Sequence, residues 1–79
     1  MIHKLKIEQN YLDNLIDGRK KAEVRYNDRD YQLGDVLEFY YGFPHSKQFR
    51  FLITHIHSGL GLDNGYVVLS VKAVNGEQP

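Results

Sequence analysis

Glu23 and Arg25 lie two positions apart in a stretch of alternating charged and apolar residues, and Lys20 lies three positions before Glu23. Residues two apart on a β-strand project from the same face, so the carboxylate and the guanidinium would lie side by side. Such a pair can orient the guanidinium toward a phosphate or a base edge. The Lys20 ammonium is a flexible point charge that also suits a phosphate. These residue types at this spacing therefore indicate a phosphate-binding or base-binding site.

Both features also have a purely structural explanation. Glu23 and Arg25 have the spacing of an ordinary surface ion pair, and such pairs contribute about 0–1 kcal/mol to stability. Lys20 has the position of a solvated lysine that stabilises the end of a preceding helix. Spacing alone favours the structural explanation for Glu23 and Arg25, and it leaves both explanations open for Lys20. In either case, we predict that the strand turns Val24 toward the core and its charged residues outward.

Three neighbours, Lys21, Tyr26 and Arg29, complete the candidate nucleic-acid-binding surface. Tyr26 ends the basic strand, so it is the tyrosine that we expect to stack on an exposed base. Most tyrosines of a small barrel are instead half-buried, with the hydroxyl group in water. Arg29 lies between Asp28 and Asp30, which favours a locally neutralised arginine that holds a turn.

A metal site is the weaker hypothesis for the histidines. His55 and His57 are two apart on a predicted strand, which would place both on one metal ion. No third ligand accompanies them, because His45 lies in a predicted loop and Asp63 is distant. We therefore expect a packed or hydrogen-bonded His55, no metal and no cofactor. Asp35 follows a glycine in a turn, and we expect no catalytic role for it.

Length and composition restrict the class of protein. A chain of 79 residues forms one domain with a small core, because it buries only about 60% of the surface that its unfolded form exposes. The absence of cysteine excludes disulfides and thiolate metal sites. A formal net charge of zero means that electrostatic recognition must come from a local patch. No apolar run is long enough for a membrane span, and the N-terminus lacks the apolar core of a signal peptide. We therefore expect a cytoplasmic protein that is not associated with a membrane.

The hydrophobic pattern predicts one helix among several strands. Alternation over residues 3–8 predicts a half-buried strand. Apolar residues at helical spacing predict a two-turn helix over residues 10–17, with Asn10 as the N-cap and Gly18 as the C-terminal stop. Further strands are predicted at residues 21–26, 36–41, 48–57 and 66–74. The long strand at 48–57 carries apolar residues on both faces, so we expect it to be central or bent.

This order predicts a small α+β barrel of five or six mainly antiparallel strands with one principal helix. We expect one domain over residues 1–79, a hairpin loop at 42–46 and a frayed tail at 75–79. The residues predicted to form the core are Leu5, Ile7, Leu15, Val24, Val36, Leu37, Phe51, Ile53, Val67 and Leu69.

The spacing of Gly18, Lys20, Glu23 and Arg25, G-x-K-x-x-E-x-R, resembles the hallmark of ASCH domains, which have the PUA-like fold. The run NDRDYQLGD at residues 27–35 is similar to that of a small ASCH-related family of uncharacterised phage and bacterial proteins. The opening HKLKI, the segment THI at 54–56 and GYVVLS at 65–70 resemble further strands of that family. The resemblance covers nearly the whole chain, although the loop GFPHSK is shorter than in related members.

The resemblance implies a PUA-like barrel with a helix covering a cleft, and an RNA-binding role. The expected partner is single-stranded or structured RNA, or a nucleotide-like ligand, bound by a monomer. The residues that we expect to contact it are Lys20, Lys21, Glu23, Arg25, Tyr26 and Arg29.

Two alternatives remain open at this point. One ASCH branch consists of amidohydrolases that act on N4-acylated cytidine and use a Lys and a Thr. Here Lys20 stands at the Lys position but Glu23 replaces the Thr, and a carboxylate lacks the nucleophilic hydroxyl. A hydrolase of modified nucleosides, or a ribonuclease, would use Lys20 and Glu23. The other alternative is a small phage-related module that binds another protein.

Overall fold

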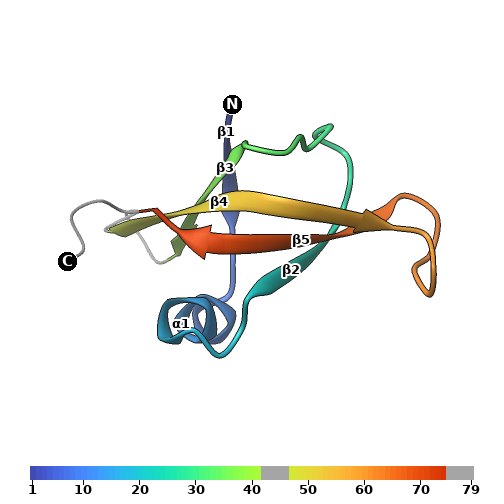
Figure 1. The fold of residues 1–79 in the computed structure, drawn as a ribbon. Coiled ribbons are helices and arrows are strands. Elements are labelled where there is room, and N and C mark those ends of the chain that lie inside the picture. Colours follow the sequence, from blue (N-terminus) through green and yellow to red (C-terminus); the bar gives the residue numbers. More distant parts are fainter. Residues whose placement is uncertain (42–46, 75–79) are drawn as a thin grey trace.

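The computed structural model describes residues 1–41 and 47–74. Along the chain lie β1 (Ile2–Lys6), α1 (Gln9–Asp17), β2 (Ala22–Tyr26), β3 (Val36–Tyr41), β4 (Lys47–Ser58) and β5 (Tyr66–Ala73) (Figure 1). This order confirms the prediction of one strand, one helix and four further strands. The predicted loop at 42–46 and the predicted tail at 75–79 lie outside the described residues.

The five strands form one mixed sheet in the order β1-β3-β4-β5-β2. β1 and β3 are parallel, whereas the other three neighbouring pairs are antiparallel, as expected for a mainly antiparallel sheet. The sheet curls so that β1 and β3 cross behind β4 and β5 (Figure 1). The result is a half-barrel whose two edge strands, β1 and β2, are not paired with each other.

β4 is both central and bent, as its two apolar faces predicted. A register shift between Ile53 and His55 interrupts its pairing with β5. Such a bulge adds one residue to one strand and bends it. Phe51 and Ile53 are buried before the shift, and Ile56 packs against the core after it.

The ends of α1 are defined by backbone contacts. The Glu8 carbonyl accepts a hydrogen bond from the N–H of Leu12 at 3.1 Å, and Glu8 occupies the N-cap without a side-chain cap bond. The prediction of Asn10 as the N-cap is therefore wrong, because the helix begins earlier than the sequence indicated. Gly18 ends the helix in the left-handed conformation with φ of 84°, and its N–H donates to the carbonyl of Leu15. That stop was predicted, because glycine adopts positive φ without a steric penalty.

The core joins one side of α1 to the inner face of the sheet. Most of the predicted core residues are buried, but Val36 is only half-buried and Val24 is exposed. The prediction for Val24 is wrong, because this side chain lies on the outer face of β2. Buried apolar and aromatic core residues that the sequence did not identify are Leu12, Tyr31, Phe39 and Val71. No helix in the described part of the chain is long and apolar enough to span a membrane.

Candidate functional site

β2 turns its charged side chains toward the inside of the half-barrel. Glu23 is 7% exposed and Val24 is 54% exposed, so the prediction that the charged residues point outward is wrong. The reason is the pairing with β5, which sets Glu23 opposite the buried Leu69 and Arg25 opposite the buried Val67. Because side chains alternate along a strand, assigning one residue to the wrong face assigns every other residue of the strand to the wrong face as well.

Lys20, Glu23 and Arg25 converge through two ion pairs, and we call them the charge cluster. The Glu23 Oε1 atom lies 3.3 Å from the Lys20 Nζ atom. The Glu23 Oε2 atom accepts a hydrogen bond from the Arg25 Nε atom at 3.2 Å. The side chains of Lys20 and Arg25 are 31% and 24% exposed, against 9% for Glu23. Two partly exposed cations are thus held by one buried carboxylate.

Arg25 also links the two edge strands. Its Nη2 atom donates to the carbonyl of Lys6, the last residue of β1, at 3.2 Å. Its guanidinium carbon lies 5.7 Å from the ring centre of the buried Phe39. The Lys20 ammonium lies 5.9 Å from the ring centre of Tyr11 on α1. Cations at these distances from a ring face are attracted by it, so ring contacts help to fix both cations.

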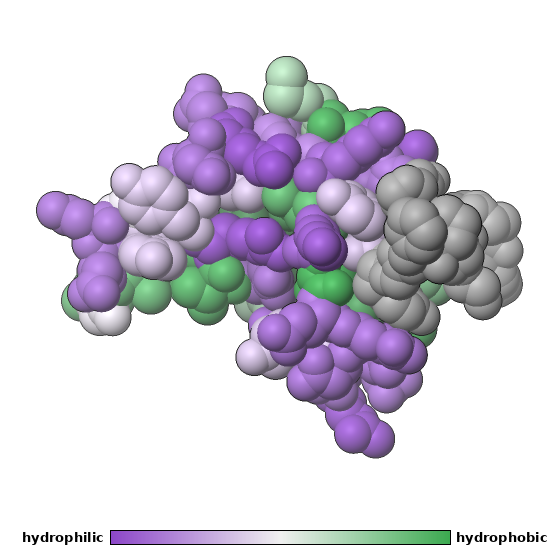
Figure 2. Space-filling view, turned by 180° about the vertical axis from the view of Figure 1, so that it is seen from behind, coloured by the Kyte–Doolittle hydropathy of each residue, from purple (hydrophilic) through white to green (hydrophobic). Residues whose placement is uncertain are grey.

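The remaining predicted binding residues lie outside the charge cluster. Lys21 and Arg29 are exposed, and Tyr26 is 55% exposed on the outer face of β2. Among the described residues, Arg29 forms no ion pair with Asp28 or Asp30. The ion pairs that would neutralise Arg29 in the turn are therefore not seen. Hydrophilic residues cover much of the described surface as seen from behind (Figure 2).

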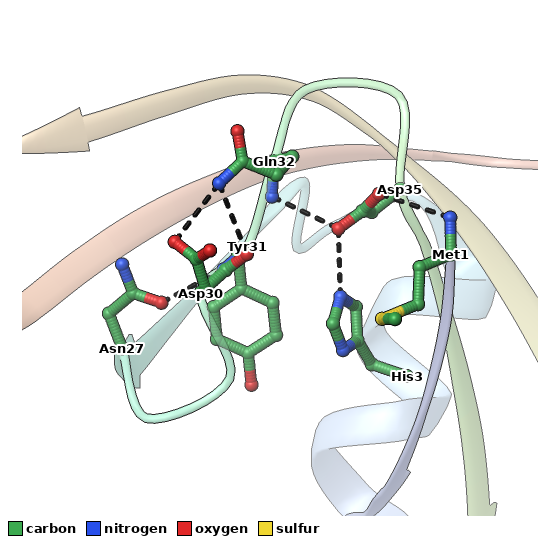
Figure 3. Close-up of polar contacts among 7 residues, drawn as sticks. All are labelled: Met1, His3, Asn27, Asp30, Tyr31, Gln32 and Asp35. Carbon is green, nitrogen blue, oxygen red and sulfur yellow. Dashed lines mark hydrogen bonds and ion pairs between the residues drawn. The ribbon is translucent and has the colours of Figure 1, made fainter.

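A second polar group, the Asp35 network, anchors the loop between β2 and β3 (Figure 3). Asp35 Oδ2 lies 2.8 Å from the Nε2 atom of the buried His3. The same oxygen accepts a hydrogen bond from the Gln32 N–H at 3.0 Å, and Oδ1 accepts one from the Met1 amine at 3.2 Å. Asp35, which the sequence placed in a turn, therefore ties that turn to β1.

Tyr31 packs beside the Asp35 network. It is 3% exposed, and its ring lies edge-on to His3 with 4.9 Å between ring centres. Burial raises the pKa of the Tyr31 hydroxyl, and the positive charges of Arg25 and Arg29 oppose that rise. Sequence reasoning missed Tyr31 and His3. The signal that could have found Tyr31 is an aromatic residue next to a polar turn. The turn residues around it instead favoured a surface loop.

Acid should weaken the contribution of Asp35 to stability. The hydrogen bond from His3 is the main cause that holds the pKa of Asp35 below its ordinary value of 3.8. A carboxyl group with a lowered folded-state pKa stabilises the fold above its unfolded-state pKa. That contribution is lost as the pH falls through the folded-state pKa.

We expect Asp35→Asn to lower the free energy of unfolding by about 1–3 kcal/mol near neutral pH. The difference from wild type should narrow below about pH 4. Urea unfolding at a series of pH values measures this. Asp13→Asn, at an exposed carboxylate on α1, is the control that should show no such narrowing. A difference that stays constant with pH would contradict the role of Asp35.

His55 and His57 lie on β4 beyond the register shift. His55 is exposed, and the His57 Nε2 atom lies 3.5 Å from the carbonyl oxygen of Leu60. Within residues 1–41 and 47–74, no three His, Asp or Glu side chains gather as metal ligands. His45 lies outside the described residues.

Residues 2–71 match the model of a family described as "Domain of unknown function (DUF3850)". A stretch of 36 residues is 44% identical to the "Uncharacterized 12.9 kDa protein in GpA 3'region" of Escherichia phage P2. That stretch covers 46% of this chain but only 33% of the phage protein. The similarity to phage proteins of unknown function was predicted.

The fold is also similar to that in the crystal structure of hypothetical protein PH0355. The TM-score is 0.67, over 94% of this chain and 100% of the other. Because the two sequences are only 14% identical, this likeness concerns the fold alone.

Proposed function

This chain belongs to the DUF3850 family, and from its charge cluster we propose that it binds RNA, or another nucleotide-containing ligand, as an ASCH domain of PUA-like fold. The observation that carries the proposal is the pairing of one buried carboxylate with two partly exposed cations. Each oxygen of Glu23 holds one cation, so the ammonium of Lys20 and the guanidinium of Arg25 stay close together. Two such cations suit the phosphates of a nucleic acid.

The same geometry favours an orienting role for Glu23 over a catalytic one. Both of its carboxylate oxygens are engaged by cations, which is the arrangement expected of a group that positions Lys20 and Arg25. Glu23 also stands where the amidohydrolases that the chain resembles have their threonine, and it has no hydroxyl group to serve as a nucleophile. We therefore propose binding rather than turnover.

Exposed residues on and beside β2 provide further proposed contacts, of which Tyr26 lies on the strand face opposite the charge cluster. Lys21 and Arg29 are both exposed on the chain segment that contains β2, where they add positive charge for the sugar-phosphate backbone. Tyr26 is exposed at the end of the same strand. Aromatic side chains in such positions stack on unpaired bases, which are splayed out in single-stranded RNA. The proposed ligand is therefore single-stranded RNA rather than a duplex.

A titration of a short fluorescein-labelled single-stranded RNA at low salt tests the proposal. Lys20→Met removes one charge of the cluster and keeps an apolar stem, so we expect affinity to fall about five- to tenfold. Lys72→Met removes an equally charged side chain that is exposed on β5, and it should leave affinity within about twofold of wild type. Equal losses in the two variants would mean that net charge, and not this site, governs binding.

A further inference from the structure

The loop between β4 and β5, residues 59–65, forms one side of an open hollow of about 380 Å³. Asn27, Asp63, Asn64 and Tyr66 contribute polar or aromatic groups to its lining. A second hollow of about 250 Å³ shares Asp63 and Tyr66 and adds Val24. Apolar surface lies at this end of the molecule, on the left of the view from behind (Figure 2). The larger volume falls in the range of about 300–1,000 Å³ that is typical of small-molecule sites.

Backbone hydrogen bonds hold the loop in this shape. The Leu62 N–H donates to the Gly59 carbonyl at 3.0 Å, and the Tyr66 N–H donates to the Asp63 carbonyl at 3.1 Å. The Asn27 N–H, at the end of β2, donates to a carbonyl of the same loop at 2.7 Å. These bonds connect the loop within itself and to β2, so the hollow is formed before any ligand binds.

Two tyrosines form an aromatic wall beside the hollow. Tyr66 and Tyr26 are 41% and 55% exposed, and their rings meet edge-on with 5.3 Å between centres. Gly65 packs directly on the ring of Tyr26, because a Cβ atom added there would lie 2.5 Å from it. The wall is thus held in place while its rings stay accessible. Exposed, fixed aromatic rings are the platforms on which single bases stack.

Two of the residues that line the hollow, Asn27 and Asp63, carry side chains that can donate and accept hydrogen bonds. The Asn27 Oδ1 atom accepts a hydrogen bond from the backbone N–H of Tyr31 at 3.0 Å. Because a backbone N–H can only donate, this contact identifies the oxygen and leaves the Asn27 amide nitrogen as a donor. Figure 3 shows that nitrogen turned away from Tyr31. The Asp63 side chain is exposed and, as a carboxylate, only accepts.

We propose that this hollow binds a nucleobase, with guanine preferred. The base stacks on Tyr66, its N1–H and N2–H donate to the Asp63 carboxylate, and its O6 accepts from the Asn27 amide. A carboxylate accepts two parallel N–H bonds, and guanine alone among the four bases has two adjacent N–H donors beside a carbonyl oxygen. The site shares no residue with the charge cluster, so it stands whether or not that cluster binds phosphate.

Amide NMR shifts of the ¹⁵N-labelled protein, titrated with GMP, AMP, CMP and UMP, test the proposal. We expect GMP to bind about tenfold more tightly than the others and to shift the amides of residues 59–66 and Asn27. Guanosine, which lacks the phosphate, should shift the same amides. Asp63→Asn should weaken GMP binding about tenfold. Asp13→Asn, which removes an exposed carboxylate from α1, should leave it unchanged.

Three outcomes would overturn the guanine site. Shifts confined to the region of Lys20 and Arg25, equal for all four nucleotides and absent with guanosine, would support phosphate binding and exclude a base site. Equal affinity of the hollow for all four nucleotides would contradict recognition by Asp63. No shift at the amides of residues 59–66 with either GMP or guanosine would exclude the hollow as a binding site.

Discussion

Phe51→Ala is expected to lower the free energy of unfolding by about 3–5 kcal/mol. Phe51 is 3% exposed, and its ring lies 5.9 Å from that of Phe39, centre to centre. Removing the ring leaves a cavity in a core that has few other aromatic side chains. Domains of this size are stable by only about 5–15 kcal/mol, so the loss should be a large share of the total. The midpoint of urea unfolding measures it.

Val24→Ala is the matched control for this prediction. The sequence placed Val24 in the core, but it is 54% exposed on the outer face of β2. We expect its replacement to change stability by no more than about 0.5 kcal/mol. A midpoint that Phe51→Ala leaves unmoved, or a loss from Val24→Ala of similar size, would show that the strand faces are assigned wrongly.

Removing the guanidinium of the charge cluster should be the other large loss. In Arg25→Met, the buried Glu23 carboxylate keeps only Lys20 as a partner, and the link to the Lys6 carbonyl is lost. We expect a cost of about 1–3 kcal/mol, because a buried charge that loses a partner is left poorly solvated. Urea unfolding of the purified variant measures that cost.

Adding Glu23→Gln to Arg25→Met should recover part of the loss, since a neutral amide needs less compensation. A double-mutant cycle over these two positions should give a coupling energy of about 0.5–3 kcal/mol. Strictly additive effects would mean that the two side chains act independently. In the single variant Glu23→Gln, RNA affinity should fall only mildly if Glu23 orients Arg25. Loss of an enzymatic turnover with binding intact would instead identify Glu23 as a catalytic acid or base.

The elements of this fold could be predicted because each depends on a local pattern. Helical spacing over residues 10–17 and a glycine at position 18 define α1 to within one residue. Apolar residues on both faces of residues 48–57 identified β4 as the central strand. The spacing of apolar residues follows from which residues contact the core, so this periodicity is enough to locate the helix and the strands.

The face of β2 could not be predicted in the same way. Charged and apolar residues alternate there, and the usual rule puts the apolar set inside. The rule fails because Lys20, Glu23 and Arg25 form ion pairs with one another on the inner side of the half-barrel. On the outer face, Val24 lies opposite the half-buried Val68. Only the register with β5 shows this.

The Asp35 network and the hollow beside Tyr66 depend on contacts between distant parts of the chain. His3 and Asp35 are 32 residues apart in sequence, and Asn27 meets a loop more than thirty residues farther along the chain. No short motif encodes such contacts. The residues that make these contacts are single residues in polar turns. Their presence is explained equally well by the turn itself, so the sequence does not reveal the contacts.

The dependence of RNA affinity on salt tests most directly whether the charge cluster binds phosphates. About three phosphate contacts predict that log K falls with log salt concentration with a slope of about −2 for a single strand. In Lys20→Met the slope should become shallower by about 0.7, because one contact is lost. Lys20 is a cleaner probe than Arg25, which also contacts the Lys6 carbonyl. Equal affinities and equal slopes for wild type and Lys20→Met would contradict binding at the charge cluster.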